Sequence, residues 1–497
     1  MLRTKPTRIY LYILLLVTVT LRLINLSYSD YIQDEVTTFF YWGGMKNVTM
    51  TPYNFLLNEQ KGPLQVLVGY IPRAIVGNYD NALAQRLPFA LFGIASVLMF
   101  YYMVEKLTKN SLVAFLAAFL FSTNGLILGY SRIAQYQNLL FFFSFSSLYY
   151  FADLINAKLK GANLMRSTII GSVLFSIGFY AHWYAVFILI PIGYLIAVFL
   201  LNKKRPIKIK ITVILANLLI VLALILPYYV PYIKNLLGSE RNTDYAERLL
   251  GKGKPFSERR DLKQFFLYNP FLTYYLYLAL GFIGIVVSRK KVIFTVWFLV
   301  VLAFFRYFVL YTGLHFYNIF IPLIILVAYG MSFFLKSKLR LVRYASTVLV
   351  ALVLAFLYVQ SYLVFVDHRT EYPMQQEQIL YWKTRSYSHE DRMRHKTGFP
   401  HKRYWEEINA WVNEQNPTHE VPYDYHTNED KGIARIYMDS SQSREDHLYI
   451  IGIKNPYSMA YDFKFSQFKP KSTVHTIENE YGVNVVRIYR LDERNEK

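Results

Sequence analysis

Two adjacent carboxylates, Asp34 and Glu35, follow the first apolar segment of the chain, and Lys61 lies further along the same polar stretch. A pair of carboxylates beside a membrane can act as a general base, a metal ligand or a cation binder. A lysine can hold a phosphate group as a point charge. These residues alone suit an ordinary solvated loop equally well. The choice between a functional site and such a loop therefore depends on the elements that position them.

Composition predicts a polytopic membrane protein, because 54% of the 497 residues are hydrophobic and 18% are aromatic. Residues 1–366 hold 35 Lys and Arg against 12 Asp and Glu, whereas residues 367–497 hold 19 against 21. The basic excess therefore orients membrane loops and meets anionic lipid. The soluble part has no basic stripe with interleaved aromatic residues, which argues against nucleic acid as a partner. The absence of cysteine excludes disulfides, thiolate metal sites and cysteine nucleophiles.

Eleven apolar segments predict a mainly α-helical, polytopic fold with about 11 transmembrane helices. The first, residues 9–26, follows a basic N-terminus without a cleavage site and predicts an uncleaved anchor. The others are residues 82–104, 112–129, 138–155, 167–181, 184–201, 211–230, 270–287, 292–311, 316–335 and 344–366.

Lysine and arginine distribution gives the orientation of these segments. The short pieces predicted to be cytoplasmic hold about 20 Lys and Arg, whereas the short loops on the other side hold almost none. We therefore expect a multi-pass protein of the cell membrane with a cytoplasmic N-terminus. Two long outer loops, 27–81 and 231–269, complete a membrane domain over residues 1–366, and residues 367–497 form an extracytoplasmic domain.

This topology gathers polar side chains at the outer face, as an active site at the membrane surface requires. They are Asp34, Glu35, Glu59, Lys61, Arg132, Gln135, Tyr136, His182 and His315. Residues 61–73 predict a helix that lies in the interface, because their apolar side is interrupted by prolines.

Residues 367–497 predict a small α/β domain. An amphipathic helix is expected over 401–414, before Asn416-Pro417. Strands are expected over 434–438, 447–453, 473–478 and 484–491, and the last two flank Tyr481-Gly482 as a hairpin.

Several runs together resemble the GT-C superfamily, and more narrowly the branch of the protein O-mannosyltransferases and the aminoarabinose transferase of lipid A. The runs are Asp34-Glu35 through Lys61-Gly-Pro-Leu, Gln85-Arg-Leu-Pro-Phe-Ala-Leu-Phe-Gly93, Tyr130-Ser-Arg-Ile-Ala-Gln-Tyr-Gln-Asn138, His315-Phe-Tyr-Asn-Ile-Phe-Ile-Pro322 and the C-terminal run 472–490. Their order and sidedness carry the resemblance, since no single motif is unique.

The resemblance implies transfer of a sugar from a polyprenyl-phosphate donor to an acceptor hydroxyl of a protein, glycan or lipid, with inversion, at the outer face. Asp34 would be the base that takes the acceptor proton. Glu35 would support it or share a divalent metal ion, the one cofactor that these residues suggest. Lys61 would hold the donor phosphate, which is a stabilised leaving group that needs positive charge more than a protonating acid.

Further site residues follow from the same resemblance. The residues expected to bind substrate are Glu59, Gln135, Tyr136, Asn138, His182 and Tyr317, and Arg132 is expected at the donor phosphate. Two departures from the family pattern argue against the aminoarabinose enzyme's metal site at Glu59: Gly62-Pro63 replaces Pro-Pro, and Gln60 separates Glu59 from Lys61. Asn138 or Gln137 stands where the lipid A branch often has Asp, which argues against that substrate.

Two residues keep alternative interpretations. Arg306 lies within an apolar segment near its outer end and either snorkels to the interface or binds phosphate with His315. His182 lies in an aromatic turn, where packing competes with a catalytic role.

Two other functions are compatible with the sequence. A transporter or flippase of a lipid-linked or anionic substrate would use the same charged residues for binding, but transporters place polar groups at the midplane and show internal repeats, which this sequence lacks. A non-catalytic scaffold would leave Asp34 dispensable. The sequence does not name the sugar or the acceptor.

Overall fold

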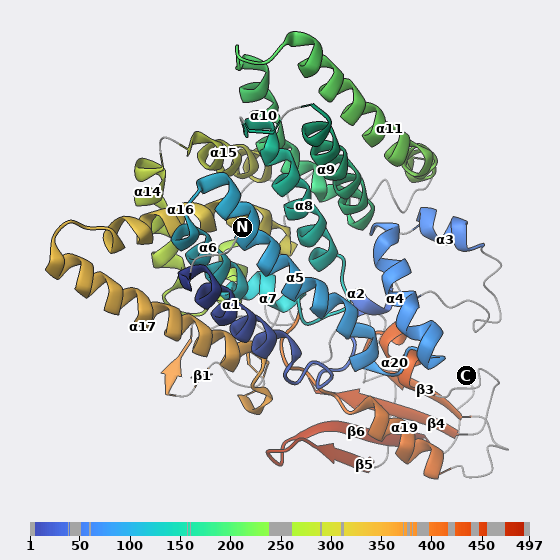
Figure 1. Ribbon diagram of the computed structural model, residues 1–497. Coiled ribbons are helices and arrows are strands. Elements are labelled where there is room, and N and C mark those ends of the chain that lie inside the picture. Colours follow the sequence, from blue (N-terminus) through green and yellow to red (C-terminus); the bar gives the residue numbers. More distant parts are fainter. Residues whose placement is uncertain are drawn as a thin grey trace.

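The computed structural model describes residues 5–37, 39, 51–58, 61–156, 158–159, 161–237, 261–288, 291–309, 313–370, 372–374, 378–379, 381–384, 397–415, 423–438, 447–454 and 473–491. A bundle of helices forms most of the molecule, and a small mixed sheet with two helices covers one end of it (Figure 1).

Each of the eleven predicted segments forms helix. They correspond to α1 (Lys5–Leu23), α5 (Ala82–Thr108), α6 (Ser111–Thr123) with α7 (Gly125–Tyr130), α8 (Gln137–Phe151) with η1 (Ala152–Ile155), α9 (Gly161–Ala181), η2 (Trp183–Ile188) with α10 (Leu189–Leu201), α11 (Ile207–Leu237), α14 (Thr273–Val287), α15 (Val292–Tyr307), α16 (Tyr317–Leu335) and α17 (Arg340–Phe365). The remaining helices are α2 (Gln33–Val36), α3 (Pro52–Asn58), α4 (Pro63–Val76), α13 (Asp261–Tyr268), η5 (Gly313–Phe316) and η6 (His368–Thr370).

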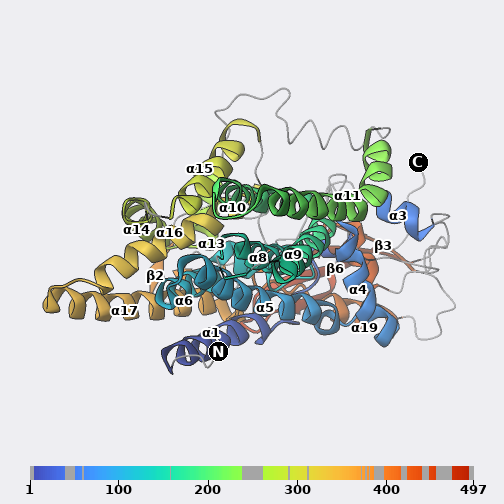
Figure 2. The same cartoon turned by 45° about the horizontal axis from the view of Figure 1, so that its top comes forward.

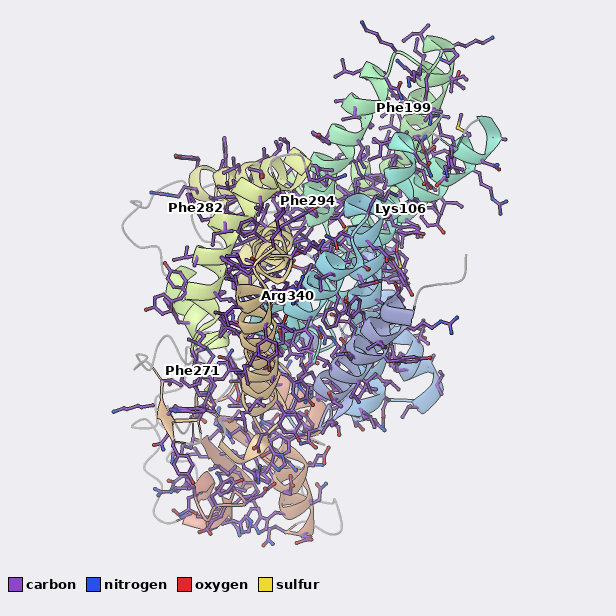
Figure 3. All side chains as sticks on the ribbon, turned by 60° about the vertical axis from the view of Figure 1, so that its left-hand side comes forward. Lys106, Phe199, Phe271, Phe282, Phe294 and Arg340 are labelled. Carbon is purple, nitrogen blue, oxygen red and sulfur yellow. The ribbon has the colours of Figure 1, made fainter. Side chains whose placement is uncertain are left out.

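Seven of the described helices are long and apolar enough to cross a membrane, counting α8 with η1 and η2 with α10; α6, α14 and α15 are apolar but shorter. The protein is therefore a multi-pass membrane protein, as the composition predicts. Figures 1 and 2 show α5, α6 and α8 side by side in the middle of the bundle. On its periphery, Phe282 is 70% exposed, as expected of a lipid-facing side chain, whereas Phe294 is fully buried (Figure 3).

The predicted continuous segment 112–129 is wrong in one respect, because the helix breaks at Asn124. The Asn124 side chain accepts hydrogen bonds from the backbone N–H groups of Leu126 and Ile127 and so caps a new helix, α7. A Cβ atom at Gly125 would overlap the carbonyl oxygen of Tyr268. The break thus brings backbone of α13 against the start of α7.

The C-terminal residues form a four-stranded sheet in the order β3-β4-β6-β5. The strands are β3 (Tyr423–Thr427), β4 (His447–Ile453), β5 (Thr473–Glu478) and β6 (Asn484–Leu491), and a separate hairpin joins β1 (Gln378–Ile379) to β2 (Trp382–Lys383). β3 runs parallel to β4, while β4 and β5 run antiparallel to β6. The predicted strands 447–453, 473–478 and 484–491 are confirmed.

Two helices of this domain, α19 (Trp405–Glu414) and α20 (Lys431–Tyr437), differ from the prediction. Residues 434–438 were expected as a strand, yet most of them belong to α20. Its buried side chains, Ile433, Ala434, Tyr437 and Met438, have helical spacing. The predicted helix 401–414 begins only at Trp405, because Tyr404 has a left-handed backbone with φ of 60°.

The closest helix pair, α14 and α16, gives a stability test. A Cβ atom at Gly284 would overlap the carbonyl oxygen of Leu326, so Gly284→Ala must push the two helices apart. Overpacking of this kind costs about 1–3 kcal/mol, and we expect the midpoint of thermal unfolding in detergent to fall by several degrees. Gly193→Ala is the matched control, because nothing lies within 4 Å of a Cβ there. Equal midpoints for the two variants would contradict the packing.

Candidate active site

The short helix α2 carries both predicted carboxylates, and it turns them in different directions. The Asp34 side chain is 56% exposed, whereas Glu35 is fully buried. Adjacent positions on a helix differ by about 100° in direction, so one turn of helix can expose one residue and bury the next. The two carboxylates therefore have separate surroundings.

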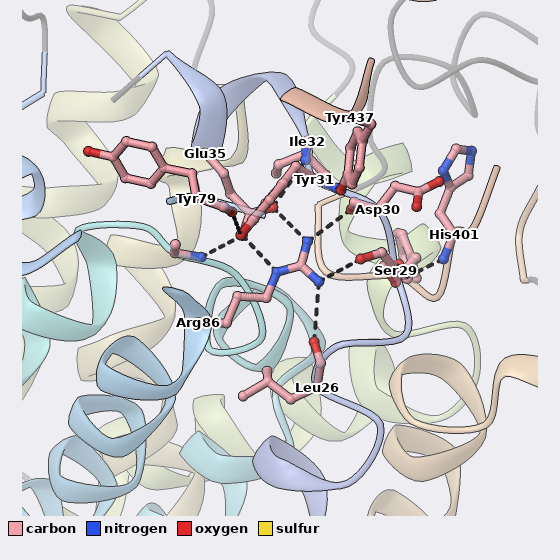
Figure 4. Close-up of polar contacts among 12 residues, drawn as sticks. Leu26, Ser29, Asp30, Tyr31, Ile32, Glu35, Tyr79, Arg86, His401 and Tyr437 are labelled. Atoms are coloured by element: carbon pink, nitrogen blue, oxygen red, sulfur yellow. Dashed lines mark hydrogen bonds and ion pairs between the residues drawn. The ribbon is translucent and has the colours of Figure 1, made fainter. Parts of the chain in front are cut away.

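Glu35 makes a bidentate ion pair with Arg86 of α5 (Figure 4). Arg86 Nε lies 2.8 Å from Oε1 and Nη2 lies 2.8 Å from Oε2. The backbone N–H of Ala134 also donates to Oε1, and that of Ile32 donates to Oε2, at 2.8 and 3.0 Å. Both oxygens thus accept two hydrogen bonds each, and Glu35 has no capacity left to support Asp34 directly.

Arg86 uses its remaining N–H groups to hold the loop that precedes α2. Nη1 donates to the carbonyl oxygens of Leu26 and Ser29, and Nη2 donates to that of Asp30. All five guanidinium donors are therefore satisfied. A fully paired arginine of this kind fixes residues 26–35 relative to α5 (Figure 4).

Asp34 contacts Lys61, which the sequence places in the same loop. Lys61 Nζ lies 3.2 Å from Asp34 Oδ1 and 2.7 Å from the Asp34 carbonyl oxygen, and it lies 3.4 Å from Thr37 Oγ1. The lysine side chain is 17% exposed. An ammonium group thus lies beside a carboxylate that remains open to solvent.

Two features place Lys61 at the start of α4. A Cβ atom at Gly62 would overlap the carbonyl oxygens of Tyr180 and Ala181, so only glycine fits between Lys61 and Pro63. This close approach explains the glycine that precedes Pro63. Gln65 then ties α4 to the loop before α8: it donates to the Ala134 carbonyl oxygen at 3.1 Å and accepts from the Tyr136 N–H at 3.1 Å.

The pKa of the Asp34 carboxyl lies below its usual value. Desolvation by the protein atoms crowded around it would on its own raise the pKa, although the side chain is accessible. The charge of Lys61 and its hydrogen bond to the carboxylate, together with smaller contributions from Gln135 and His315, outweigh this effect. Asp34 is therefore ionised at neutral pH and able to accept a proton.

Two neutral histidines border this site. The His182 ring stacks on Tyr136 at 4.2 Å between centroids, and its Nδ1 accepts from the Tyr184 N–H. His315 Nδ1 lies 3.4 Å from the Tyr136 hydroxyl. Burial, with the nearby charge of Lys61, lowers the pKa of His182 well below its usual value and that of His315 to about 4. Both rings are therefore uncharged at neutral pH and suited to packing or hydrogen bonding.

Arg132 and Asn138 take part in contacts inside the bundle. The Arg132 guanidinium donates to the carbonyl oxygens of Leu21, Ile24 and Asn25 at 2.8–2.9 Å, which satisfies the end of α1. Asn138 is fully buried and donates to the Tyr130 carbonyl oxygen. Their geometry supports structural roles, and the donor and substrate roles expected from the resemblance remain predictions.

The structure describes three of the remaining predicted residues, Gln135, Tyr317 and Arg306. Gln135 and Tyr317 are buried, and Tyr317 packs against Tyr130, Phe141 and His315. Arg306 is exposed at the end of α15 and lies over the ring of Tyr307. Glu59 lies outside the described residues, so its role also remains a prediction.

A metal site at Asp34 and Glu35 does not fit this geometry, because both oxygens of Glu35 accept hydrogen bonds from Arg86 and from backbone N–H groups. Within the residues that the structure describes, no group of three or more His, Asp or Glu side chains is arranged to hold a metal ion.

Arg86 and Gln65 both position the site, and neither was predicted to do so. Arg86 offered a signal, since it is a charged residue one turn into an apolar segment and such residues are expensive unless paired. Gln65 offered none, because a single glutamine on an interfacial helix is common.

Comparison with known proteins agrees with this architecture. Residues 9–236, which include Asp34 and Lys61, match the family model of dolichyl-phosphate-mannose-protein mannosyltransferases. No curated protein sequence matches the chain.

Solved structures with similar folds include ArnT from Cupriavidus metallidurans bound to undecaprenyl phosphate, with a TM-score of 0.55, 10% identity and 98% of each chain covered. The S. cerevisiae Pmt1-Pmt2 protein O-mannosyltransferase complex bound to the sugar donor gives a TM-score of 0.37 at 16% identity, and the match covers 48% of this chain and 34% of that one. AglB from Archaeoglobus fulgidus, an oligosaccharyltransferase in complex with an inhibitory peptide and a dolichol-phosphate, gives 0.48 at 14%, over 93% of this chain and 62% of that one. The chain thus resembles the mannosyltransferase family over residues 9–236, and its fold resembles that of ArnT over 98% of its length.

The buried ion pair gives a second test. Arg86→Met leaves the Glu35 carboxylate buried without its cation, and breaking a buried pair costs about 3–5 kcal/mol. We expect thermal unfolding of Arg86→Met and of Glu35→Gln at clearly lower temperature than wild type. The double variant should lose less than the sum of the two single losses. Arg73→Met is the control, since Arg73 is an arginine of the neighbouring helix α4 that contacts the rings of Tyr70 and Tyr79. Strictly additive losses would contradict the pairing.

Proposed function

We propose that this protein transfers a sugar from a polyprenyl-phosphate-linked donor to an acceptor hydroxyl of a protein, glycan or lipid, at the outer face of the membrane and with inversion of the anomeric carbon. The observation that carries the proposal is the contact of 3.2 Å between an accessible carboxylate, Asp34, and an ammonium group, Lys61. The family match over residues 9–236 supports it.

Asp34 is the general base of the proposed reaction. A base must be ionised at the working pH and must reach the proton that it takes, and Asp34 meets both conditions. As the acceptor oxygen attacks the anomeric carbon, its proton passes to the Asp34 carboxylate. The bond from that carbon to the phosphate oxygen breaks, and the polyprenyl phosphate leaves with the electron pair.

Lys61 stabilises the leaving phosphate. A phosphate monoester is already a stable anion, so it needs a nearby positive charge and not a proton donor. Lys61 Nζ now donates to two groups of Asp34. Binding of the donor would bring the phosphate to the same ammonium group, which holds the base and the leaving group close together.

The arrangement of the two α2 carboxylates supports inversion. A double displacement needs a carboxylate nucleophile as well as an acid–base residue. Glu35, the neighbour of Asp34, is committed to Arg86 and two backbone N–H groups. A single displacement with Asp34 as base is the reaction that this arrangement supports.

Two further parts of the proposal are the lipid carrier of the donor and the side of the membrane on which the site lies. The matched family is that of dolichyl-phosphate-mannose-protein mannosyltransferases, and the ArnT structure contains undecaprenyl phosphate. Both favour a polyprenyl-phosphate carrier as the donor. The excess of basic residues in the short loops opposite the site favours a cytoplasmic N-terminus and an extracytoplasmic C-terminal domain.

A transfer assay tests the function. Purified protein is incubated with radiolabelled polyprenyl-phosphate sugars and a membrane extract as the source of acceptor. We expect wild type to form labelled product and Asp34→Asn to lose most turnover, by about 10²–10⁴-fold, while it still binds donor. Asp80→Asn, an exposed aspartate of the same loop, should keep activity. Movement of the donor across reconstituted vesicles without any glycosidic bond would instead establish a transporter.

The pH dependence tests the pair itself. Because the charge of Lys61 lowers the pKa of Asp34, Lys61→Gln should raise that pKa, and ionised Asp34 should be lost at higher pH than in wild type. The acidic limb of the kcat/KM profile should therefore move to higher pH, and the donor KM should rise. An acidic limb at the same pH as in wild type would contradict the claim that Lys61 lowers the pKa of Asp34.

A further inference from the structure

The start of the first outer loop is part of the hydrophobic core of the C-terminal domain. Four buried residues of that loop, Tyr31, Val36, Phe39 and Tyr79, form one cluster with residues from α19, α20 and the sheet. The C-terminal members of the cluster include Trp405, Ile408, Ile433, Ala434, Tyr437, Ile451 and Val486. The α2 helix, which carries Asp34, is therefore packed between α5 of the bundle and α20 of the C-terminal domain.

Two polar contacts with α20 hold the N-terminal side of α2. The backbone N–H of Tyr31 donates to the Tyr437 hydroxyl at 2.9 Å, and the two rings lie 5.9 Å apart (Figure 4). The Gln33 side chain donates to Asp430 Oδ2 at 3.2 Å. The other oxygen of Asp430 accepts from the Gly432 N–H and caps α20, so the start of α20 and the start of α2 share one carboxylate.

Residues just before α2 are held in the same way. The Asp30 N–H donates to the His401 carbonyl oxygen at 3.0 Å, and the His401 N–H donates to Ser29 Oγ at 3.0 Å. The Arg403 N–H donates to the Asp30 carboxylate. On the opposite side, Arg86 binds the carbonyl oxygens of Ser29 and Asp30. The backbone before Asp34 is therefore held by hydrogen bonds with His401 and Arg403 on one side and with Arg86 on the other.

We infer that Tyr437, together with the Asp430–Gln33 contact, makes the C-terminal domain a positioning element for the base: Tyr437 is a positioning residue that acts on Asp34 through the backbone of Tyr31 and the α2 helix. The inference rests on the proposed function. A four-residue helix makes too few internal hydrogen bonds to hold itself, so its orientation depends on what it packs against. A displacement of about 1 Å at a reacting group can reduce turnover by about 10²-fold.

The tests use variants that spare the fold. Tyr437→Phe removes one hydroxyl and keeps the ring in the core, and Gln33→Ala breaks the Asp430 contact from the α2 side without changing the C-terminal domain. Tyr489→Phe is the matched control, since Tyr489 is a half-buried tyrosine of β6. All variants are made in the full-length chain.

Two readouts are compared for each variant. Hydrogen exchange followed by mass spectrometry reports the backbone amides of residues 31–37, and the transfer assay gives kcat and the donor KM. We expect faster exchange at 31–37 and a kcat reduced by roughly 10- to 100-fold with the donor KM unchanged in Tyr437→Phe, and a smaller effect of the same kind in Gln33→Ala. Tyr489→Phe should behave as wild type.

Unchanged exchange at residues 31–37 in both variants would overturn the inference, as would faster exchange with unchanged kcat. A wild-type protein without transferase activity would refute the proposed function instead. The exchange data would still show whether α20 holds α2, so the two failures are distinguishable.

Discussion

A bidentate contact between the Arg86 guanidinium and the Glu35 carboxylate fixes the start of the first long loop against the helix bundle. Burying two charges carries a desolvation cost that only good geometry and further hydrogen bonds offset. Here the five donors of Arg86 and both oxygens of Glu35 are fully used. The orientation of α2, and with it the place of Asp34, depends on this contact.

The two adjacent carboxylates consequently have different tasks. Glu35 is buried and holds the loop, while Asp34 is accessible and lies beside Lys61. The α4 helix completes the arrangement, because Gly62 packs on the backbone of α9 and Gln65 binds the loop before α8. Parts of the chain that are far apart in sequence thereby bring a carboxylate and an ammonium group within 3.2 Å.

The sequence predicted those features that depend on local pattern. Apolar segments of sufficient length marked the helices, and alternation with a turn at Tyr481-Gly482 marked the β5–β6 hairpin. It also placed Asp34 and Lys61 in one loop. It did not predict that Glu35 is buried, because that burial depends on Arg86, 51 positions after Glu35 in the sequence.

Other errors have the same origin in tertiary contacts. The buried side of α20 faces the first outer loop and the sheet, and that contact selects a helix where a short apolar run also fits a strand. Arg132, which the family resemblance places at the donor phosphate, also makes contacts that the sequence did not predict. Its guanidinium satisfies the end of α1, more than 100 positions away.

A structure of the full-length protein with a polyprenyl phosphate bound tests the central claim most directly, namely that Asp34 and Lys61 form the site of sugar transfer. The account predicts the phosphate in contact with Lys61 Nζ and the open side of Asp34 facing the position of the sugar. A phosphate bound at Arg306 or elsewhere, with Lys61 still committed to Asp34 and no space beside that carboxylate, would contradict it.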